Sequence, residues 1–253
     1  VFWTTVIVLT AIAAVVSYRL TGPPPPDKIR LATGESGGAY ASFGRQYQKA
    51  LERNGLKVEL VPTQGSVDNL RQLIEGKVDV AFAQSGTYEE ISAADEEMVV
   101  RGIAAIGLEP VWVFYRQPDV EELPSDVHLF LNRKLAIGEP NSGTNLISRK
   151  ILEVNGIDDE NTTLLELPMT EAAELLKSGT IDAAIFVSSY RGSVIQDLLD
   201  TDDEDLHLLG IRRHEAYTRL FPYLTPIELS EGVLDLRTNL PEETSALLAP
   251  SVL

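Results

Sequence analysis

The sequence of 253 residues contains no cysteine, which excludes disulfides, thiolate metal sites, cysteine nucleophiles and a lipidated N-terminal cysteine within it. Histidine is almost as scarce. His128, His207 and His214 are scattered, and none has a second metal ligand at a useful spacing. We therefore expect no metal and no cofactor, and a core, surface or helix-end role for each histidine.

Positive charge is also in short supply, with 21 Lys and Arg against 38 Asp and Glu and a formal net charge of −17. A nucleic-acid partner is excluded on this ground, because contacts to phosphates need a basic surface. The acidic clusters Glu121-Glu122 and Asp200–Asp205 are interpreted as solvated loops. The length suffices for one large domain or for two lobes with a real core.

Residues 1–18 lack charge altogether and are rich in Val, Ile, Ala and Leu, with Trp3 and Tyr18 placed like interfacial aromatics. The stretch is about as long as a minimal membrane span, and no A-x-A-like cleavage site follows it. We favour an uncleaved anchor over a cleaved signal peptide, although the missing upstream flank leaves its orientation open. Pro23–Pro26 predicts a stiff spacer between the anchor and the rest of the chain.

The rest of the chain alternates strands and helices, and one unit occurs twice. Ile29–Gly86 reads as strand, glycine turn, helix, strand, helix and strand, and Leu135–Ser189 repeats this order. The equivalent glycines Gly34 and Gly138 are 104 positions apart, and the equivalent aspartates of the third strands, Asp79 and Asp182, are 103 apart. A repeated open α/β unit predicts two similar lobes, with the ligand between them at the carboxyl ends of the strands.

Apolar spacing and turn residues place the elements within each unit. We expect helices over about 39–54 and after Ser66 as N-cap, and later from Thr144 to Gly156 and after Thr170 as cap. Strands are expected at 56–61, 78–83, 163–167 and 181–187. The expected core-facing residues are Phe43, Tyr47, Ala50 and Leu51 in the first helix and Ile147, Ile151, Leu152 and Val154 in its counterpart.

Two connections between the lobes are expected. Glu109–Tyr115 is an extended aromatic stretch suited to one crossing, and the second is predicted near Phe221–Leu224. The predicted organisation is therefore an anchor (1–19), a Pro-rich linker (20–28), lobe 1 (29–113), lobe 2 (114–221) and a return segment to lobe 1 (222–253) that looks truncated. The chain as given, without an initial methionine, is expected to be a fragment.

Three predicted helix N-termini face the same cleft, and each offers unpaired N–H donors and the positive end of a helix dipole. This pattern predicts an anion site, whereas the plainer interpretation is a set of ordinary caps and turns. A carboxylate ligand gains no long-range steering from so acidic a protein, so an arginine is expected to help, with Arg191 best placed and Arg45 and Arg71 in surface pairs. The backbone candidates are Gly37, Gly38, Ala39, Ser66, Val67, Gly143 and Thr144, and the side-chain candidates are Ser36, Ser66, Asn69, Ser142 and Thr144.

A different class is suggested by Gly34–Gly38, which fits G-x-S-x-G, the nucleophile elbow of α/β-hydrolases, at a strand-to-helix turn. Against a serine esterase using Ser36, the motif follows the first strand, no oxyanion loop precedes it, and no histidine has triad context. The second copy of the unit also loses the pattern. The esterase is kept only as an alternative.

Several motifs together resemble the TAXI family of solute-binding proteins of TRAP transporters, specifically its membrane-anchored branch. They are ATGESGGAY (32–40), GSVDNL (65–70), DVAFAQS (79–85), WVFY (112–115), NSGT (141–144) and IDAAIF (181–186), in the family's order over about 28–248. The resemblance implies a two-lobed type II periplasmic binding protein fold that closes on a small carboxylate such as glutamate or a dicarboxylate, and a sodium-driven TRAP-type permease as partner. Its ligand-contacting turns carry over to Ser36, Gly37, Gly38, Ala39, Tyr40, Thr63 to Asn69 (with Gly65, Ser66 and Val67), Gln84, Ser85, Ser142, Gly143 and Thr144.

The leading hypothesis is a non-enzymatic solute-binding protein, anchored in the inner (plasma) membrane with its globular part periplasmic. The family's final lobe 1 elements, expected after Leu248, are missing from this sequence. A second hypothesis keeps the binding fold but makes it a ligand sensor that signals through the membrane segment.

Overall fold

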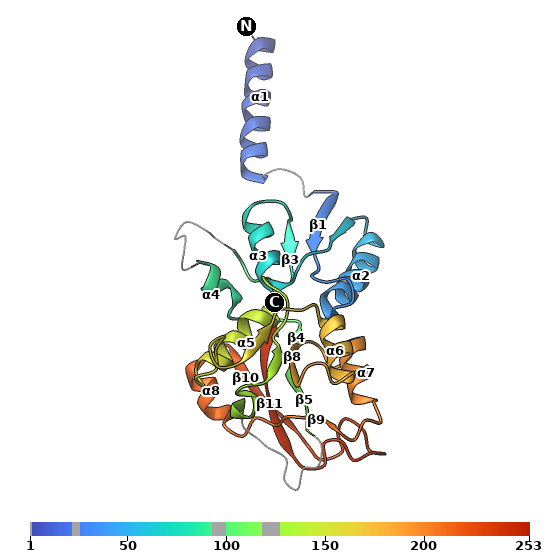
Figure 1. The fold of residues 1–253 in the computed structure, drawn as a ribbon. Helices are drawn as coiled ribbons and strands as arrows, with labels where there is room; N and C mark the ends of the chain where they lie inside the picture. The colour runs from blue at the N-terminus through green and yellow to red at the C-terminus, as the bar shows by residue number, and fades with distance from the viewer. Residues whose placement is uncertain (1, 22–25, 93–99, 118–126) are drawn as a thin grey trace.

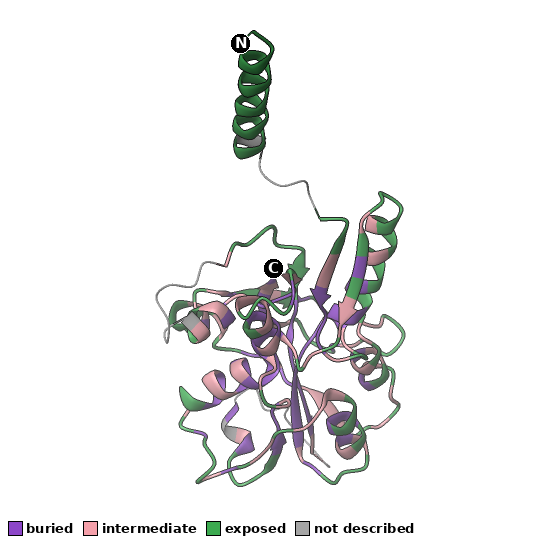
Figure 2. Ribbon diagram, turned by 90° about the horizontal axis from the view of Figure 1, so that it is seen from above, coloured by how far each residue is buried: buried purple, intermediate pink, exposed green. Residues whose placement is uncertain are grey.

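The computed structural model describes residues 2–21, 26–92, 100–117 and 127–253 (Figure 1). Helix α1 (Phe2–Thr21) stands apart from the rest of the chain. Its segment Phe2–Arg19 has a mean hydropathy of 1.6 and no buried residue, as Figure 2 also shows. Length and composition make it a candidate membrane span or signal sequence. Most of the predicted proline spacer and Glu121-Glu122 lie outside the described residues.

The first repeat unit forms a small layered α/β structure, which we call lobe 1. Its parallel sheet has the order β2-β1-β3. Its buried core is small and is centred on Leu31, Tyr40, Val58 and Phe82. The elements are β1 (Lys28–Ala32), α2 (Ala39–Glu52), β2 (Lys57–Val61), α3 (Ser66–Ile74), β3 (Val80–Ala81) and α4 (Thr87–Ser92).

The inward face of α2 differs from the predicted one. Phe43 packs against the core, but Tyr47 is 42% exposed and Ala50 is also exposed. The helix instead buries its start and Gly44. The reason is a close approach to Thr33, the residue after β1, because a Cβ on Gly44 would lie 2.6 Å from Thr33 Cγ2.

The second repeat unit, extended by further strands, forms lobe 2 around the sheet β7-β6-β8-β5-β9, in which β5 runs antiparallel to its neighbours. Both faces of this sheet are covered: along β5, Val113 and Tyr115 face one core cluster, and Trp112 and Phe114 face the other. The elements are β5 (Val111–Arg116), η1 (Val127–Phe130), β6 (Lys134–Ala136), α5 (Gly143–Glu153), β7 (Thr163–Leu165), α6 (Met169–Lys177), β8 (Ala183–Val187), α7 (Ser193–Leu199), β9 (Leu206–Leu208) and α8 (His214–Leu220).

The predicted duplication is confirmed by the topology, since β2-β1-β3 and β7-β6-β8 are the same parallel motif. Each copy contains the same local contact. Asp79 Oδ2 accepts from the amide of Arg30 at 2.8 Å, and Asp182 Oδ2 accepts from the amide of Lys134 at 2.7 Å. The repeated aspartate therefore holds the third strand of each lobe beside the first. In the second copy Val154, predicted to face inward, is 47% exposed.

The second crossing between the lobes is not where it was predicted. After Phe221 the chain enters β10 (Leu224–Leu229), which pairs antiparallel with β11 (Ser245–Val252). The end of β11 then reaches lobe 1, where Leu253 and Ala83 exchange backbone hydrogen bonds of 2.7 and 3.0 Å. β11 also pairs with β4 (Gly107–Leu108), so the two crossings run side by side. A strand crosses between the lobes at lower cost than the aromatic turn at 221–224, because its backbone N–H and C=O groups stay hydrogen-bonded to neighbouring strands.

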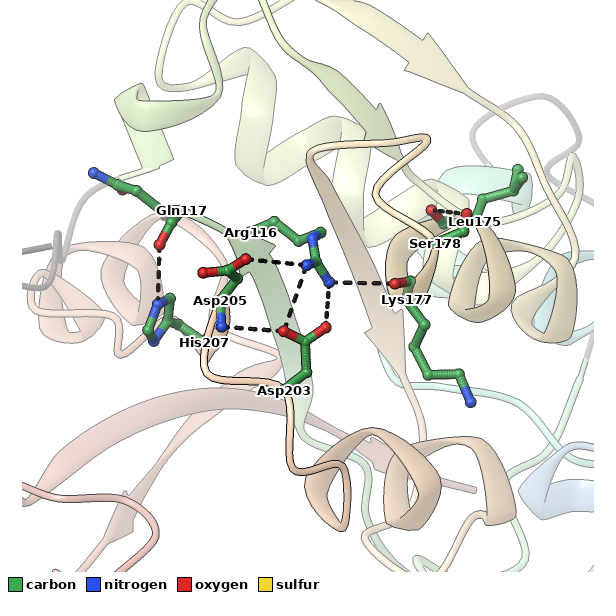
Figure 3. A network of polar contacts seen from close by, with 8 residues as sticks. All are labelled: Arg116, Gln117, Leu175, Lys177, Ser178, Asp203, Asp205 and His207. Carbon is green, nitrogen blue, oxygen red and sulfur yellow. Dashed lines mark hydrogen bonds and ion pairs between the residues drawn. The ribbon is translucent and has the colours of Figure 1, made fainter. Parts of the chain in front are cut away.

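One of the acidic clusters interpreted as solvated loops has a structural role. Arg116 at the end of β5 pairs with Asp203 at 2.5 Å and with Asp205 at 3.5 Å (Figure 3). The Asp205 amide in turn donates to Asp203, and His207 on β9 contacts the carbonyl of Gln117. The guanidinium lowers the pKa of Asp203. The cluster thus fastens the edge strand β9 to the sheet.

Candidate functional site

A cavity of about 70 Å³ lies between the lobes, at the carboxyl ends of β1 and β3 on one side and of β6 and β8 on the other. Lobe 1 lines it with Thr33, Gly34, Glu35, Gly38, Ala39, Tyr40, Gln64, Gly65, Ser66 and Gln84. Lobe 2 adds Gly138, Glu139, Ser142, Gly143, Thr144, Leu167, Met169, Ala172 and Ile185–Ser188, and Glu109 comes from the crossing. This is the position expected for a ligand in two open α/β sheets.

Three helices begin at the wall of this cavity, which Ala39 and Tyr40 of α2, Ser66 of α3, and Gly143 and Thr144 of α5 line. The first amides of α2 (Ala39 and Tyr40), of α3 (Ser66 and Val67) and of α5 (Gly143 and Thr144) have no acceptor among the described residues. Each of these helices has nine residues or more. Unpaired amides at aligned helix termini make the cavity wall an array of hydrogen-bond donors.

Glycines allow α3 and α5 to approach one another across the cleft. Gly65 has φ 128°, which favours glycine, and a Cβ there would lie 3.2 Å from Ser142 Cα. A Cβ on Gly143 would lie 1.8 Å from Gln84 Oε1. The sequence prediction of facing glycine turns is therefore matched by contacts between the lobes.

The structure brings nine of the sequence-predicted site residues to the cavity wall. They are Gly38, Ala39, Tyr40, Gly65, Ser66, Gln84, Ser142, Gly143 and Thr144. Two of the polar residues, Ser142 and Thr144, also stabilise lobe 2. Ser142 caps α5 by accepting from the Asn145 amide at 3.0 Å, and Thr144 Oγ1 accepts from the Val187 amide at 3.2 Å. Both hydroxyl oxygens already accept hydrogen bonds that hold lobe 2 together.

The other predicted residues lie behind or beside the wall. Thr63 accepts from the Gly34 amide at 3.0 Å and donates to Asn69, whose Nδ2 donates to the Phe82 carbonyl at 2.7 Å. This chain of bonds braces the first glycine turn from beneath. The remaining residues outside the wall are Ser36 and Gly37, which are exposed; Val67, which is buried; Ser85, which donates to Tyr223 O; and the exposed Arg191.

Two predicted caps are wrong. The N-cap of α3 is Gly65, while the hydroxyl of Ser66 accepts from the Gln84 amide and pairs with Tyr40, both at 3.1 Å. The N-cap of α6 is Pro168 rather than Thr170, and Pro168 makes no side-chain cap. The carboxylate of Glu35 from lobe 1 accepts from the first amide of α6, at Met169, so this helix is capped across the cleft.

Glu109 is the main site residue that the sequence analysis missed. It is 2% exposed, and its Oε2 accepts from Gln84 Nε2 at 2.9 Å. Tyr40 is a second hydrogen-bond partner. Burial raises the pKa of Glu109 to about 7, and burial together with the charge of Glu109 raises the pKa of Tyr40 well above its ordinary value. The only signal in the sequence was a lone carboxylate immediately before a buried strand.

Two further acidic residues line the cavity and were also missed. Burial raises the pKa of Glu35, and burial together with the nearby charges of Glu35 and Asp68 raises the pKa of Glu139. No lysine, arginine or histidine lines the cavity in the part of the chain that is described. The predicted arginine at the ligand is therefore not among the lining residues.

Asn141 joins the two lobes at the edge of the cavity. Its φ is 65°, and its carbonyl accepts from the Asp68 amide at 3.2 Å. Its side chain donates to Gln64 at 2.9 Å and accepts from Arg71 at 2.5 Å. Arg71 is thus in a surface pair, as predicted, but its partner belongs to the other lobe. These hydrogen bonds join the two lobes in a closed conformation.

The nucleophile-elbow motif has no catalytic surroundings. Ser36 is exposed and does not line the cavity. The ring of His207 contacts the Gln117 carbonyl beside β9, and His214 begins α8 in lobe 2. Neither ring forms a hydrogen bond with Ser36 in the structure. The geometry of a Ser-His pair is therefore missing from the described residues around Ser36.

Comparisons with known proteins agree with a binding fold. The signature of the NMT1-like family matches residues 31–235. A protein from Bordetella bronchiseptica RB50 is 17% identical with a TM-score of 0.56 over 89% of this chain, which spans 64% of that protein's length. PhnD1 from Prochlorococcus marinus (MIT 9301), in complex with methylphosphonate, is 12% identical with a TM-score of 0.53 over 73% of this chain and 72% of its own. The alkanesulfonate-binding protein SsuA from Xanthomonas axonopodis pv. citri, bound to MOPS, is 15% identical with a TM-score of 0.51 over 79% and 70%. These likenesses establish the predicted two-lobed periplasmic binding protein fold.

Proposed function

The chain belongs to the NMT1-like family, and on that premise we propose that it is a solute-binding protein that captures a small ligand between its two lobes without transforming it. The observation that carries this proposal is the cavity between the lobes, whose wall includes the first residues of three helices with unpaired backbone amides. Such an arrangement holds a ligand by preformed hydrogen-bond donors.

The proposed ligand contains a carboxylate, as in glutamate or a dicarboxylate. Amides at helix N-termini favour an anionic group by their dipoles and their unpaired N–H donors, even where no basic side chain is at hand. Ala39, Ser66 and Gly143 supply one such terminus from each helix. The proposed ligand-binding set remains the sixteen residues predicted from the sequence, with Arg191 in the weakest position because it lies away from the wall.

The proposed partner is a TRAP-type permease, with the protein as a membrane-anchored member of the TAXI group. The support for this finer assignment is that the motifs at 32–40, 65–70 and 141–144, which resemble that group, contribute turns of one cavity. We further propose that α1 is an uncleaved anchor and that the globular part is periplasmic. The mature N-terminus, determined by mass spectrometry of the membrane fraction, tests the anchor.

Calorimetry and thermal shift of the full-length protein in detergent test the binding function. A panel of carboxylates, dicarboxylates and amino acids is expected to contain at least one ligand that stabilises the protein, since a ligand that binds only the native state raises its melting temperature. The absence of stabilisation by every small anion and zwitterion would contradict the proposal.

A substitution inside the cavity shows where the ligand binds. Gly143→Val places a side chain against Gln84 Oε1 and is expected to abolish binding. Gly102→Ala is the matched control, because a Cβ there meets no atom within 4 Å. Equal binding by both variants would exclude this cavity as the binding site.

A further inference from the structure

The two halves of the protein differ in charge. Residues 26–92, which form lobe 1, have 8 Lys and Arg against 9 Asp and Glu, whereas residues 127–253, which include most of lobe 2, have 10 against 21. The formal net charge is therefore −1 in lobe 1 and −11 in the second region. A negatively charged surface repels the second region strongly and lobe 1 hardly at all. The protein is thus electrically polar along the direction from lobe 1 to lobe 2.

Basic side chains gather at the end of lobe 1 that faces away from the cavity. The cavity lies at the carboxyl ends of β1 and β3, so the opposite end is where these parallel strands begin. Lys28 and Lys57 are the paired first residues of β1 and β2. Helix α2 begins at the cavity and ends at the same far end, with Lys49 in its last turn and Arg53 as its C-cap. We call these four exposed residues the basic end of lobe 1.

Three of these four cations have no partner of opposite charge. Lys28 Nζ lies 2.6 Å from Glu59 Oε2, and the two side chains are 56% and 52% exposed. Lys49, Arg53 and Lys57 form no ion pair within the described part of the chain. Exposed cations of this kind stay free to contact an external anion.

The acidic residues at this end do not cancel the positive charge. Asp27, Glu52 and Glu59 stand against the four cations, which leaves a formal charge of +1. Two further pairs at the same end are neutral overall, Arg30 with Asp79 and Lys77 with Glu75. A positive surface in a protein of net charge −17 is therefore confined to one place, at the far end of lobe 1.

A short connection ties this end to the candidate membrane span. Helix α1 ends at Thr21 and β1 begins at Lys28, so six residues join them, and Figure 1 shows β1 beginning at the end of lobe 1 that lies toward α1. A chain of this length spans at most about 25 Å when fully extended. With α1 in a bilayer, the basic end stays within reach of the headgroups, at a local concentration on the order of millimolar. A surface too weakly charged to bind a membrane from solution can dock under these conditions.

We propose that the basic end of lobe 1 docks on anionic phospholipid headgroups of the membrane in which α1 is anchored. The inference rests on the proposed anchor and goes beyond ligand capture, because it assigns a second binding surface to the protein. The chemistry that recognises it is the phosphate of the headgroup, to which Lys49, Arg53 and Lys57 offer unpaired N–H donors and positive charge.

Docking in this way determines the position of the cavity. The strands of lobe 1 lead from the basic end to the cavity, and a five-residue strand such as β1 spans roughly 17 Å. The cavity then lies about that far above the headgroups, and the acidic lobe 2 lies farther out, where an anionic membrane repels it least. The same orientation is therefore favoured by both ends of the protein.

Energy transfer from a single dye to the membrane measures the docking. The sequence has no cysteine, so Ala50→Cys gives one exposed attachment site, next to Lys49. The full-length protein is placed in nanodiscs with acceptor-labelled headgroups, made of phosphatidylcholine alone or with added phosphatidylglycerol. Transfer is expected to be greater in the anionic discs, and to fall when NaCl is raised from about 0.05 M to about 0.5 M, which shortens the Debye length about threefold. Ala216→Cys, exposed in α8 of lobe 2, is the matched control and is expected to show neither increase nor fall.

Neutral variants test the residues themselves. Each cation near an anionic membrane contributes roughly fivefold to the docked population. Removing three is therefore expected to lower the ratio of docked to undocked protein by on the order of 100-fold, and to abolish the increase in energy transfer. The variant combines Lys49→Gln, Arg53→Gln and Lys57→Gln. The control removes the same charge from exposed positions of lobe 2 and is expected to keep the increase; it combines Lys134→Gln, Arg212→Gln and Arg219→Gln.

Three outcomes contradict the proposal. Equal transfer in neutral and anionic discs overturns it, and leaves an acidic protein as the partner of the basic end. An equal loss in the two triple variants overturns it too, because the effect then follows net charge rather than position. Failure of the full-length chain to enter the discs overturns both the docking and the anchor, whereas ligand capture is measured separately by calorimetry and stands or falls independently. If the triple variant does not fold, the lipid and salt comparisons without it still decide.

Discussion

The two lobes repeat one topology but divide the tasks of the site unequally. Lobe 1 has a three-stranded sheet and a small core, and it supplies the polar cluster of Tyr40, Ser66 and Gln84. Lobe 2 has a five-stranded sheet covered on both faces, and it supplies mostly apolar wall, such as Leu167 and Phe186, together with one helix N-terminus. The two copies of the unit thus have the same backbone topology, and the side chains that differ between them make one side of the site polar and the other mostly apolar.

The largest expected difference is in core stability. Phe114→Ala removes a 2% exposed ring from the larger core and is expected to destabilise the protein by roughly 3–5 kcal/mol. Phe82→Ala, in lobe 1, is expected to cost less, about 2–3 kcal/mol, because its ring borders the partly exposed Tyr47 and the smaller core. Urea unfolding measures both. A greater loss from Phe82→Ala would show that lobe 1 is the more stable lobe.

The next effect concerns the crossing between the lobes. The pKa of Glu109 is raised to about 7 in the folded protein from its ordinary value of 4.5. At a pH between these two values the folded state therefore binds more protons than the unfolded state. Stability without ligand is therefore expected to fall as pH rises from about 5 to about 7.5, by on the order of 2–3 kcal/mol. Glu109→Gln is expected to remove most of that slope. A slope that persists in this variant would assign it to other carboxylates.

A smaller effect tests how firmly the lobes close. Asn141→Gly keeps the positive φ but removes the two side-chain bonds to lobe 1, and is expected to weaken ligand binding by about tenfold and to enlarge the particle in small-angle scattering. Asn239→Gly is a matched control, since Asn239 also has positive φ but its side chain bonds only to Glu231 of the same loop. Identical scattering from both variants would exclude Asn141 as a latch.

The smallest expected effect compares the repeated aspartates. Asp79 accepts from the Arg30 amide and guanidinium, whereas Asp182 accepts from the Lys134 amide and lies 3.6 Å from Arg133. Asp79→Asn is expected to cost about 1 kcal/mol and Asp182→Asn about half of that, because these pairs are partly exposed. Urea unfolding of both variants checks the order, and a reversed order would mean that the backbone contact outweighs the ion pair.

The sequence was most informative where local pattern determines structure. The duplicated strand, turn and helix order, the glycines that end the helices and the facing turns at Gly34 and Gly138 were all predictable, because each depends on neighbours within a few residues. The return crossing was not predictable, since the pairing of Leu253 with Ala83 joins positions far apart in sequence. The prediction of the inward face of α2 was wrong, because the close packing of Gly44 against Thr33 outweighed the spacing of the apolar residues.

The candidate site was predicted in outline but not in its charges. Backbone donors follow from helix starts, which a sequence reveals. The burial of Glu109 depends on lobe 1, lobe 2 and the crossing together, so its position before a buried strand is the only local signal of it in the sequence. Arg191 was chosen by its distance along the chain from β8, and the turn that follows this strand leaves it exposed.

The indole of Trp112 is an intrinsic fluorescence probe of the cavity wall. The sequence has two tryptophans, and Trp3 lies in α1, away from the cavity. Trp112 is 1% exposed, and its Nε1 donates at 2.9 Å to the carbonyl of Ser188, which lines the cavity. Replacing Trp3 with Phe leaves a single tryptophan. A change in the cavity wall on ligand binding can then be followed as a shift in tryptophan fluorescence, without a dye or a label.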